Sequence, residues 1–160
     1  MRTIVIMLIA FAFGYVISSY VNKQRGNKQA KIEDEEICLS EKHLKLFKLA
    51  IQWVRALLNG KRIEESLIKK GYREIAIYGM SYLGETLFDE LKETGVLVKY
   101  CIDKNADRIY GDYRIVSPDG NLDHVDAVVI TPITFYDEIA KDLLKRMDCD
   151  MVSLEDLIFD

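Results

Sequence analysis

The chain has 160 residues, of which 49% are hydrophobic and 30% charged, and its formal net charge is −4. This length allows one modest domain with a buried core, together with accessory segments. Residues 22–160 carry 21 basic and 26 acidic side chains, with no basic stripe outside the first stretch of that region. The acidic balance argues against nucleic acid as a partner.

The N-terminal part of the chain reads as a membrane anchor. Residues 3–21 contain no charged side chain, and an apolar run of this length can span a bilayer as a helix. A signal peptide cut before Ser19 is the alternative, but its apolar region would usually be only about 7–15 residues long. Basic residues mostly follow the run, so the positive-inside rule predicts a single-pass protein with a cytoplasmic C-terminal domain: Arg2 precedes it, and Lys23, Arg25, Lys28 and Lys31 follow.

Two helices are expected between the anchor and the main domain. Residues 22–39 are polar, first basic and then acidic, which is typical of a solvated juxtamembrane linker. Residues 40–71 predict a helical hairpin. Its first helix would be capped by Ser40 and end near Gly60, and its second would run from about Arg62 to Lys70 and end at Gly71.

The first helix of this hairpin has apolar residues at alternating spacings of three and four, which resembles a coiled-coil seam over two heptads. These residues are Leu44, Phe47, Ile51, Val54 and Leu58. One interpretation is that the hairpin packs on the following domain, with Phe47 and Trp53 as core or docking residues. The other is a dimerisation surface. The partner on this surface could be a second copy of the chain, giving a homodimer, or a glycosyltransferase.

Residues 72–160 predict a small Rossmann-like α/β domain, in which helices flank a parallel sheet. Residues 75–103 read as a strand, a glycine-bounded turn, a helix, a second strand and an acidic residue at that strand's end. The elements expected further along are a short strand at Arg114–Val116, a buried strand at Asp126–Ile130, a helix at Phe135–Met147 capped by Thr134 with Asp137, a strand at Asp150–Val152 and a terminal helix capped by Ser153.

The glycine-bounded turn matches part of the dinucleotide-binding fingerprint G-x-G-x-x-G. Gly79 and Gly84 occupy its first and third glycine positions. Ser81 occupies the second, where a pyrophosphate would approach the backbone. Asp103 follows Gly84 by nineteen residues, which suits an acidic residue that holds a ribose hydroxyl. Lys104 could meet a 2′-phosphate or a sugar phosphate, although ordinary solvation in a loop is favoured. The candidate binding residues are Gly79, Met80, Ser81, Tyr82, Leu83, Gly84, Asp103, Lys104 and Thr131, which should share the carboxyl edge of the sheet.

A family resemblance extends this interpretation. The stretch from Trp53 through GYREIAIYGMSYLGETLFDEL, VKYCIDKNADRIYGDYRIVSP, DAVVITP and VSLEDLI, about two thirds of the chain, resembles a Rossmann-like domain of bacterial capsule and surface-polysaccharide loci. That domain occurs alone or attached to glycosyltransferases. More distantly, the stretch is similar to the N-terminal domains of sugar O-acyltransferases, which bind the nucleotide part of a nucleotide sugar, and to the terminal domain of sugar C-methyltransferases. The resemblance implies a phosphate turn at Gly79–Gly84 and a ribose acid at Asp103. It names no reaction.

The sequence assigns no catalytic and no metal-binding residue. His124, flanked by Asp123 and Asp126, is the best candidate for a general base, although a solvated loop histidine is the favoured interpretation because the loop is polar. Glu85 and Thr86 follow the turn where a P-loop would have Lys and then Ser or Thr, which argues against nucleoside triphosphate hydrolysis. The three cysteines have no C-x-x-C spacing, so neither a disulfide framework nor a zinc site is indicated.

The leading hypothesis is therefore a membrane-anchored domain that binds a nucleotide or nucleotide sugar in surface-polysaccharide biosynthesis, without catalysing a reaction by itself. The alternative is a non-catalytic scaffold that docks a glycosyltransferase and keeps only a vestigial nucleotide site. A weaker alternative is an NAD(P)-dependent oxidoreductase, against which Ser81 and the single mononucleotide-sized half both argue.

Overall fold

The computed structural model describes residues 36–160. The chain divides into two units between Lys45 and Leu46, and the second, Leu46–Asp160, contains the α/β domain. The predicted membrane anchor, residues 3–21, lies outside the described residues. Within the described part of the chain, no helix is both long enough and apolar enough to cross a membrane.

The helix that precedes the domain covers residues 36–58. Ser40 lies inside this helix, so the prediction that it caps the N-terminus was wrong. Serine costs only a few tenths of a kcal/mol in a helix interior, too little to outweigh the helix-forming residues around it. Gly60 ends the helix as expected: its φ is +78°, and its amide donates to the carbonyl of Leu57 at 3.0 Å.

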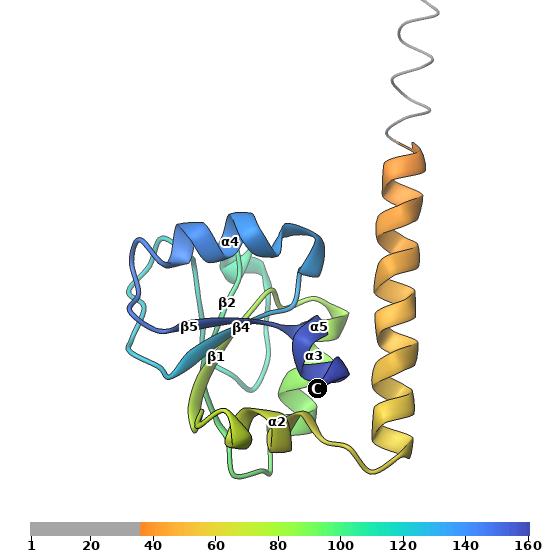
Figure 1. Cartoon of the computed structure of the whole chain (residues 1–160). Helices are drawn as coiled ribbons and strands as arrows, with labels where there is room; N and C mark the ends of the chain where they lie inside the picture. Colours follow the sequence, from red (N-terminus) through yellow and green to blue (C-terminus); the bar gives the residue numbers. More distant parts are fainter. Residues whose placement is uncertain (1–35) are drawn as a thin grey trace, which may run out of the picture. The chain divides into compact units, whose positions relative to one another are not determined.

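A five-stranded parallel sheet forms the centre of the domain (Figure 1). The strand order is β3-β2-β1-β4-β5, which is the Rossmann order and confirms the predicted α/β class. Buried aliphatic residues dominate the central strands, as expected for a sheet covered on both faces. The strands are β1 (Glu74–Tyr78), β2 (Leu97–Ile102), β3 (Ile115–Val116), β4 (Ala127–Ile130) and β5 (Asp150–Ser153).

Helices cover the two faces of the sheet unequally. Apolar residues of α2 (Ile63–Lys69), α3 (Tyr82–Leu91) and α5 (Leu154–Phe159) form one core with Ile75 and Ile77 of β1. On the opposite face, α4 (Tyr136–Leu143) packs over the neighbouring side chains of the same strand (Figure 1). This alternation along β1 places residues 76 and 78 on the α4 face.

The two predicted helix caps in the C-terminal half had different outcomes. Ser153 caps α5, since its Oγ accepts from the amide of Glu155 at 3.2 Å. Thr134 does not cap α4, because a short 3₁₀ helix at Ile133–Phe135 precedes it and no side-chain hydrogen bond caps α4. In this 3₁₀ turn the carbonyl of Pro132 accepts from the amide of Phe135 at 2.9 Å, so the chain is already tightly wound before α4 begins.

Candidate functional site

The turn at Gly79–Gly84 links β1 to α3 and requires glycine at its first position. Gly79 has φ +91°, and its amide donates to the carbonyl of Ile102 at 2.8 Å. A Cβ there would lie 2.7 Å from two ring carbons of Pro132 and 2.9 Å from Thr131 Oγ1. Backbone conformation and crowding therefore both exclude a side chain at this point.

The last glycine of the turn has a separate role in packing. A Cβ on Gly84 would lie 2.1 Å from the carbonyl oxygen of Gly79. The first turn of α3 therefore rests directly on the backbone that follows β1. This is the role predicted for the third fingerprint glycine, which lets helix and strand approach closely.

The residues between these glycines face different surroundings. Met80 is buried and Leu83 packs against the same core, so only their backbone groups could meet a ligand. Ser81 and Tyr82 are exposed. Ser81 is the N-cap residue of α3, but its side chain makes no capping hydrogen bond. The exposed surface of the turn therefore carries the Ser81 hydroxyl at the amino end of a ten-residue helix, where backbone N–H groups and the helix dipole favour anions.

Asp103 follows β2 and holds the turn in place. Its Oδ2 accepts from the amide of Met80 at 2.8 Å, and its Oδ1 accepts from the amide of Asn105 at 2.8 Å. The side chain is half-buried. Each carboxylate oxygen has a second lone pair, so this structural role leaves acceptor capacity for a ligand hydroxyl.

Thr131 follows β4 and meets the turn from the other side. Its side chain is buried, and its Oγ1 donates to the carbonyl of Gly79 at 2.7 Å. The structure thus brings Gly79, Asp103 and Thr131 together at the carboxyl edge of the sheet. Because its hydroxyl proton is given to the backbone, Thr131 positions the turn.

A pocket of about 420 Å³ opens beside this edge on the α4 face. Tyr78, Ile139 and Leu143 are the buried residues that line it, and Lys104 stands on its rim. Burial, followed by the nearby carboxylates of Asp103 and Asp142, raises the pKa of Tyr78, so its phenol stays protonated at neutral pH. Lys104 is the one predicted site residue that lines this pocket.

The rest of the pocket was missed by sequence reasoning, because its walls come from distant segments. Arg146, just after α4, donates to the carbonyls of Pro118, Asp119 and Gly120, the last at 2.8 Å, and so fixes the loop that follows β3. Lys145 pairs with Asp142 on the α4 wall at 2.6 Å. No sequence motif signals contacts of this kind, in which one guanidinium binds three backbone carbonyls.

His124 lies at the other end of the sheet. It is exposed and precedes β4, and its carbonyl accepts from Lys99 Nζ at 3.0 Å. The two carboxylates expected to orient it are engaged elsewhere: Asp123 pairs with Arg114, and Asp126 accepts from the amides of Glu74 and Arg73, bonds that lower the pKa of its carboxyl. The geometry therefore does not support His124 as a base for chemistry at the turn.

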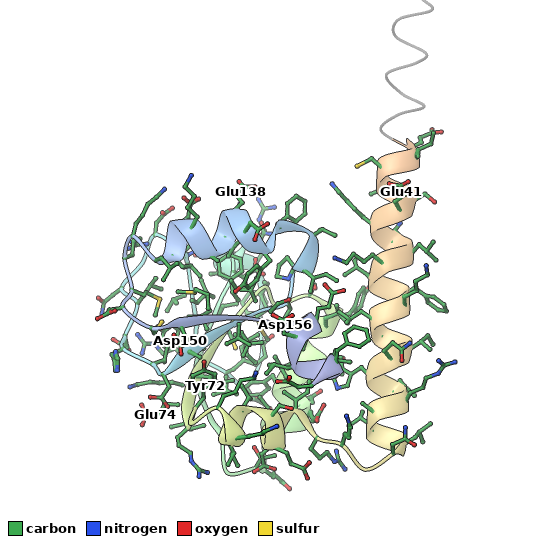
Figure 2. All side chains as sticks on the ribbon, viewed as in Figure 1. Glu41, Tyr72, Glu74, Glu138, Asp150 and Asp156 are labelled. Atoms are coloured by element: carbon green, nitrogen blue, oxygen red, sulfur yellow. The ribbon has the colours of Figure 1, made fainter. Side chains whose placement is uncertain are left out.

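Other polar contacts also gather at this amino edge. Figure 2 shows Tyr72 beside Asp150, and the Tyr72 hydroxyl donates to Asp150 Oδ2 at 2.7 Å. Burial and this bond raise the pKa of Tyr72 to about 12. These polar groups at the edge opposite the turn are thus engaged within the domain. The carboxyl edge is the candidate binding surface, because ligands of open α/β sheets bind at that edge.

One dehydrogenase-like spacing occurs at this site and was missed by sequence reasoning. Tyr100 and Lys104 have the Tyr-x-x-x-Lys spacing of short-chain dehydrogenases, but they flank the end of a strand. Four residues of strand span about 13 Å, whereas the same spacing in a helix brings side chains to one face. The buried Tyr100 hydroxyl donates to the carbonyl of Asp123 at 2.5 Å. The pair is therefore not arranged as a catalytic couple.

No protein-family model matches the chain, and neither curated proteins nor solved structures contain a significant match. Within residues 36–160, no group of three or more His, Cys, Asp or Glu side chains is placed to hold a metal ion.

Proposed function

We propose that the domain binds the nucleotide part of a nucleotide or nucleotide sugar at the carboxyl edge of its sheet. One arrangement carries this proposal: the Gly79–Gly84 turn, the amino end of α3 and Asp103 share the edge where the strand order reverses between β1 and β4. In open α/β sheets, ligands bind at this reversal.

Each group has a chemical part in this proposal. The backbone N–H groups at the amino end of α3 would meet a phosphate. Asp103 would accept from a ribose hydroxyl through its remaining lone pairs. The pocket beside Tyr78 and Lys104 would take a further part of the ligand. The domain would recognise and present the nucleotide, and no catalytic step is assigned to its side chains.

The proposed setting is surface-polysaccharide biosynthesis at a membrane. It rests on the resemblance to domains of polysaccharide loci and on the apolar run at residues 3–21. The basic residues after that run favour a cytoplasmic domain, where nucleotide sugars would be accessible.

Replacing Asp103 by alanine should weaken nucleotide binding by about tenfold or more, because hydrogen bonds to a charged group contribute about 1.5–3 kcal/mol. The measurement is calorimetry, after a thermal-shift screen of nucleoside diphosphate sugars, nicotinamide dinucleotides, S-adenosylmethionine and coenzyme A. Asp107→Ala, an exposed carboxylate four residues away, is the matched control. Unchanged affinity in Asp103→Ala would refute the ribose contact.

Asp103 also holds the amide of Met80, so a second variant separates binding from turn stability. Ser81→Gly restores the missing fingerprint glycine and removes no hydrogen bond of the helix cap. We expect it to tighten binding of pyrophosphate-containing ligands several-fold, since backbone can then approach the phosphates closely. Unchanged affinity, measured by the same titration, would place the phosphates away from this turn, and weaker affinity would refute the close approach of the backbone to them.

The second candidate function is a scaffold with a vestigial site. It is favoured by the internal use of the polar groups at the edge: both Asp103 oxygens and the Thr131 hydroxyl are bonded to backbone. Trp53, expected among core or docking residues, is buried within the domain and therefore cannot be a docking residue. Absence of stabilisation by every compound in the screen, in a folded sample, would favour this function.

A further inference from the structure

The part of the long helix that belongs to the domain unit has two apolar faces. One packs against the core through Leu46, Leu49, Trp53 and Leu57. The other, here named the exposed seam, consists of Phe47, Ile51, Val54 and Leu58, whose exposed fractions are 64, 38, 51 and 82%. The domain therefore uses only one of the two faces.

The exposed seam has the spacing of a coiled coil. Its residues are separated by four, three and four positions, an average of about 3.5, at which apolar side chains insert between those of a facing helix. Two copies of one seam are also complementary to each other, because a two-fold axis places the same patch on both partners.

The charges around the exposed seam favour a second copy as the occupant. Residues 46–58 contain Lys48 and Arg55 and no acidic side chain, whereas residues 59–160 contain 13 basic and 21 acidic side chains. Lys48 and Arg55 are exposed, and each directly follows a seam residue. At about 100° per residue, both lie on the flank of the seam away from Trp53.

The domain carries acidic residues next to the Trp53 face of the same helix. Glu90 of α3 bonds Trp53 Nε1 at 2.6 Å, and it shares an open hollow with Glu64, Asp89 and Glu93. This hollow, here named the acidic shoulder, also includes Arg62 and Lys92, so acidic groups are in excess. In a parallel helix pair, one flank of each helix faces the opposite flank of its partner. The basic flank of one copy would then face the acidic shoulder of the other.

We propose that the exposed seam is the contact between two copies of this chain, packed as a short parallel coiled coil. Lys48 and Arg55 of each copy face the acidic shoulder of the partner. A seam of four residues gives a weak contact in solution. Two chains anchored in one membrane would bind more tightly, because tethering raises their effective concentration.

The test is the oligomeric state of the full chain in detergent micelles. It is measured by sedimentation velocity over a range of protein concentrations. The wild type should dimerise, and Ile51→Glu should raise the dimer dissociation constant by roughly tenfold or more, because it sets two carboxylates into an apolar contact. Leu144→Glu makes the same apolar-to-carboxylate change at an exposed residue at the end of α4, on the other face of the sheet, and should dimerise like the wild type.

Two results would overturn the proposal. A monomeric wild type over the whole concentration range would exclude the dimer. An Ile51→Glu dimer as tight as the wild type would assign association to another part of the chain. Circular dichroism should give both variants the melting temperature of the wild type, since neither site is fully buried.

Cysteine crosslinking tests the parallel arrangement in otherwise folded protein. In a Cys38→Ser background, Phe47→Cys should form an intermolecular disulfide under mild oxidation, because equivalent seam positions face each other across a parallel axis. Gln52→Cys is the control and should remain uncrosslinked. Crosslinking that is equal in both variants, or absent from Phe47→Cys, would refute the parallel seam.

Discussion

Replacing Trp53 by alanine should lower the free energy of unfolding by about 3–5 kcal/mol, the usual cost of removing a large buried aromatic side chain. Trp53 is only 3% exposed and packs in the core shared with α2, α3 and α5. Its Nε1 donates to Glu90 at 2.6 Å, and the other oxygen of Glu90 accepts from the amide of Ile63 at 2.9 Å. One carboxylate thereby joins the long helix, α2 and α3.

Phe47→Ala is the matched control for Trp53→Ala. It removes a large aromatic from the same helix, but its side chain is mostly exposed, so its cost should stay within about 0.5 kcal/mol in the monomer. Urea unfolding followed by circular dichroism measures both variants, since the chain has a single tryptophan and loses that fluorescence signal in Trp53→Ala. If Trp53→Ala lowered the free energy of unfolding as little as Phe47→Ala, the helix would not be part of the domain core.

The comparison of these two residues also shows where sequence reasoning stopped. Phe47 and Trp53 lie on one helix whose apolar residues occupy both faces, so the hydrophobic pattern could not indicate which face the domain buries. Tertiary packing decides which face is buried. Trp53 bonds Glu90 of α3, which lies 37 residues further along the chain. The Rossmann-like sheet was more predictable, because its central strands are continuous apolar runs bounded by glycine or acidic residues.

The candidate site was predictable in position and less so in detail. Fingerprint spacing placed Gly79, Gly84 and Asp103 at one edge, and the structure brings them together. The spacing could not show that Asp103 accepts from the amide of Met80, nor that Thr131 donates to Gly79, because both bonds involve backbone groups that every residue has. The pocket beside Tyr78 depends on Arg146 and a loop more than 25 residues away, a distance that no local pattern covers.

Gly84→Ala should cost about 3 kcal/mol in unfolding free energy, at the upper end of the range for overpacking. The added Cβ would lie 2.1 Å from the carbonyl oxygen of Gly79. That carbonyl cannot retreat easily, because it accepts from the buried Thr131 hydroxyl and follows a strand paired on both sides. Relief therefore requires α3 to move away from the sheet, which would also shift the amide of Met80 from Asp103.

Thr86→Ala provides the control, as an exposed position in the same helix where alanine is the better helix former. Urea unfolding should show little change for Thr86→Ala and a large loss for Gly84→Ala. The nucleotide titration then adds a second measurement on the folded fraction: a ligand held by the turn should bind Gly84→Ala more weakly than Thr86→Ala. If Gly84→Ala lost stability but kept full affinity, the third glycine would serve packing alone, and the phosphate contact would have to be sought at the pocket beside Tyr78 and Lys104.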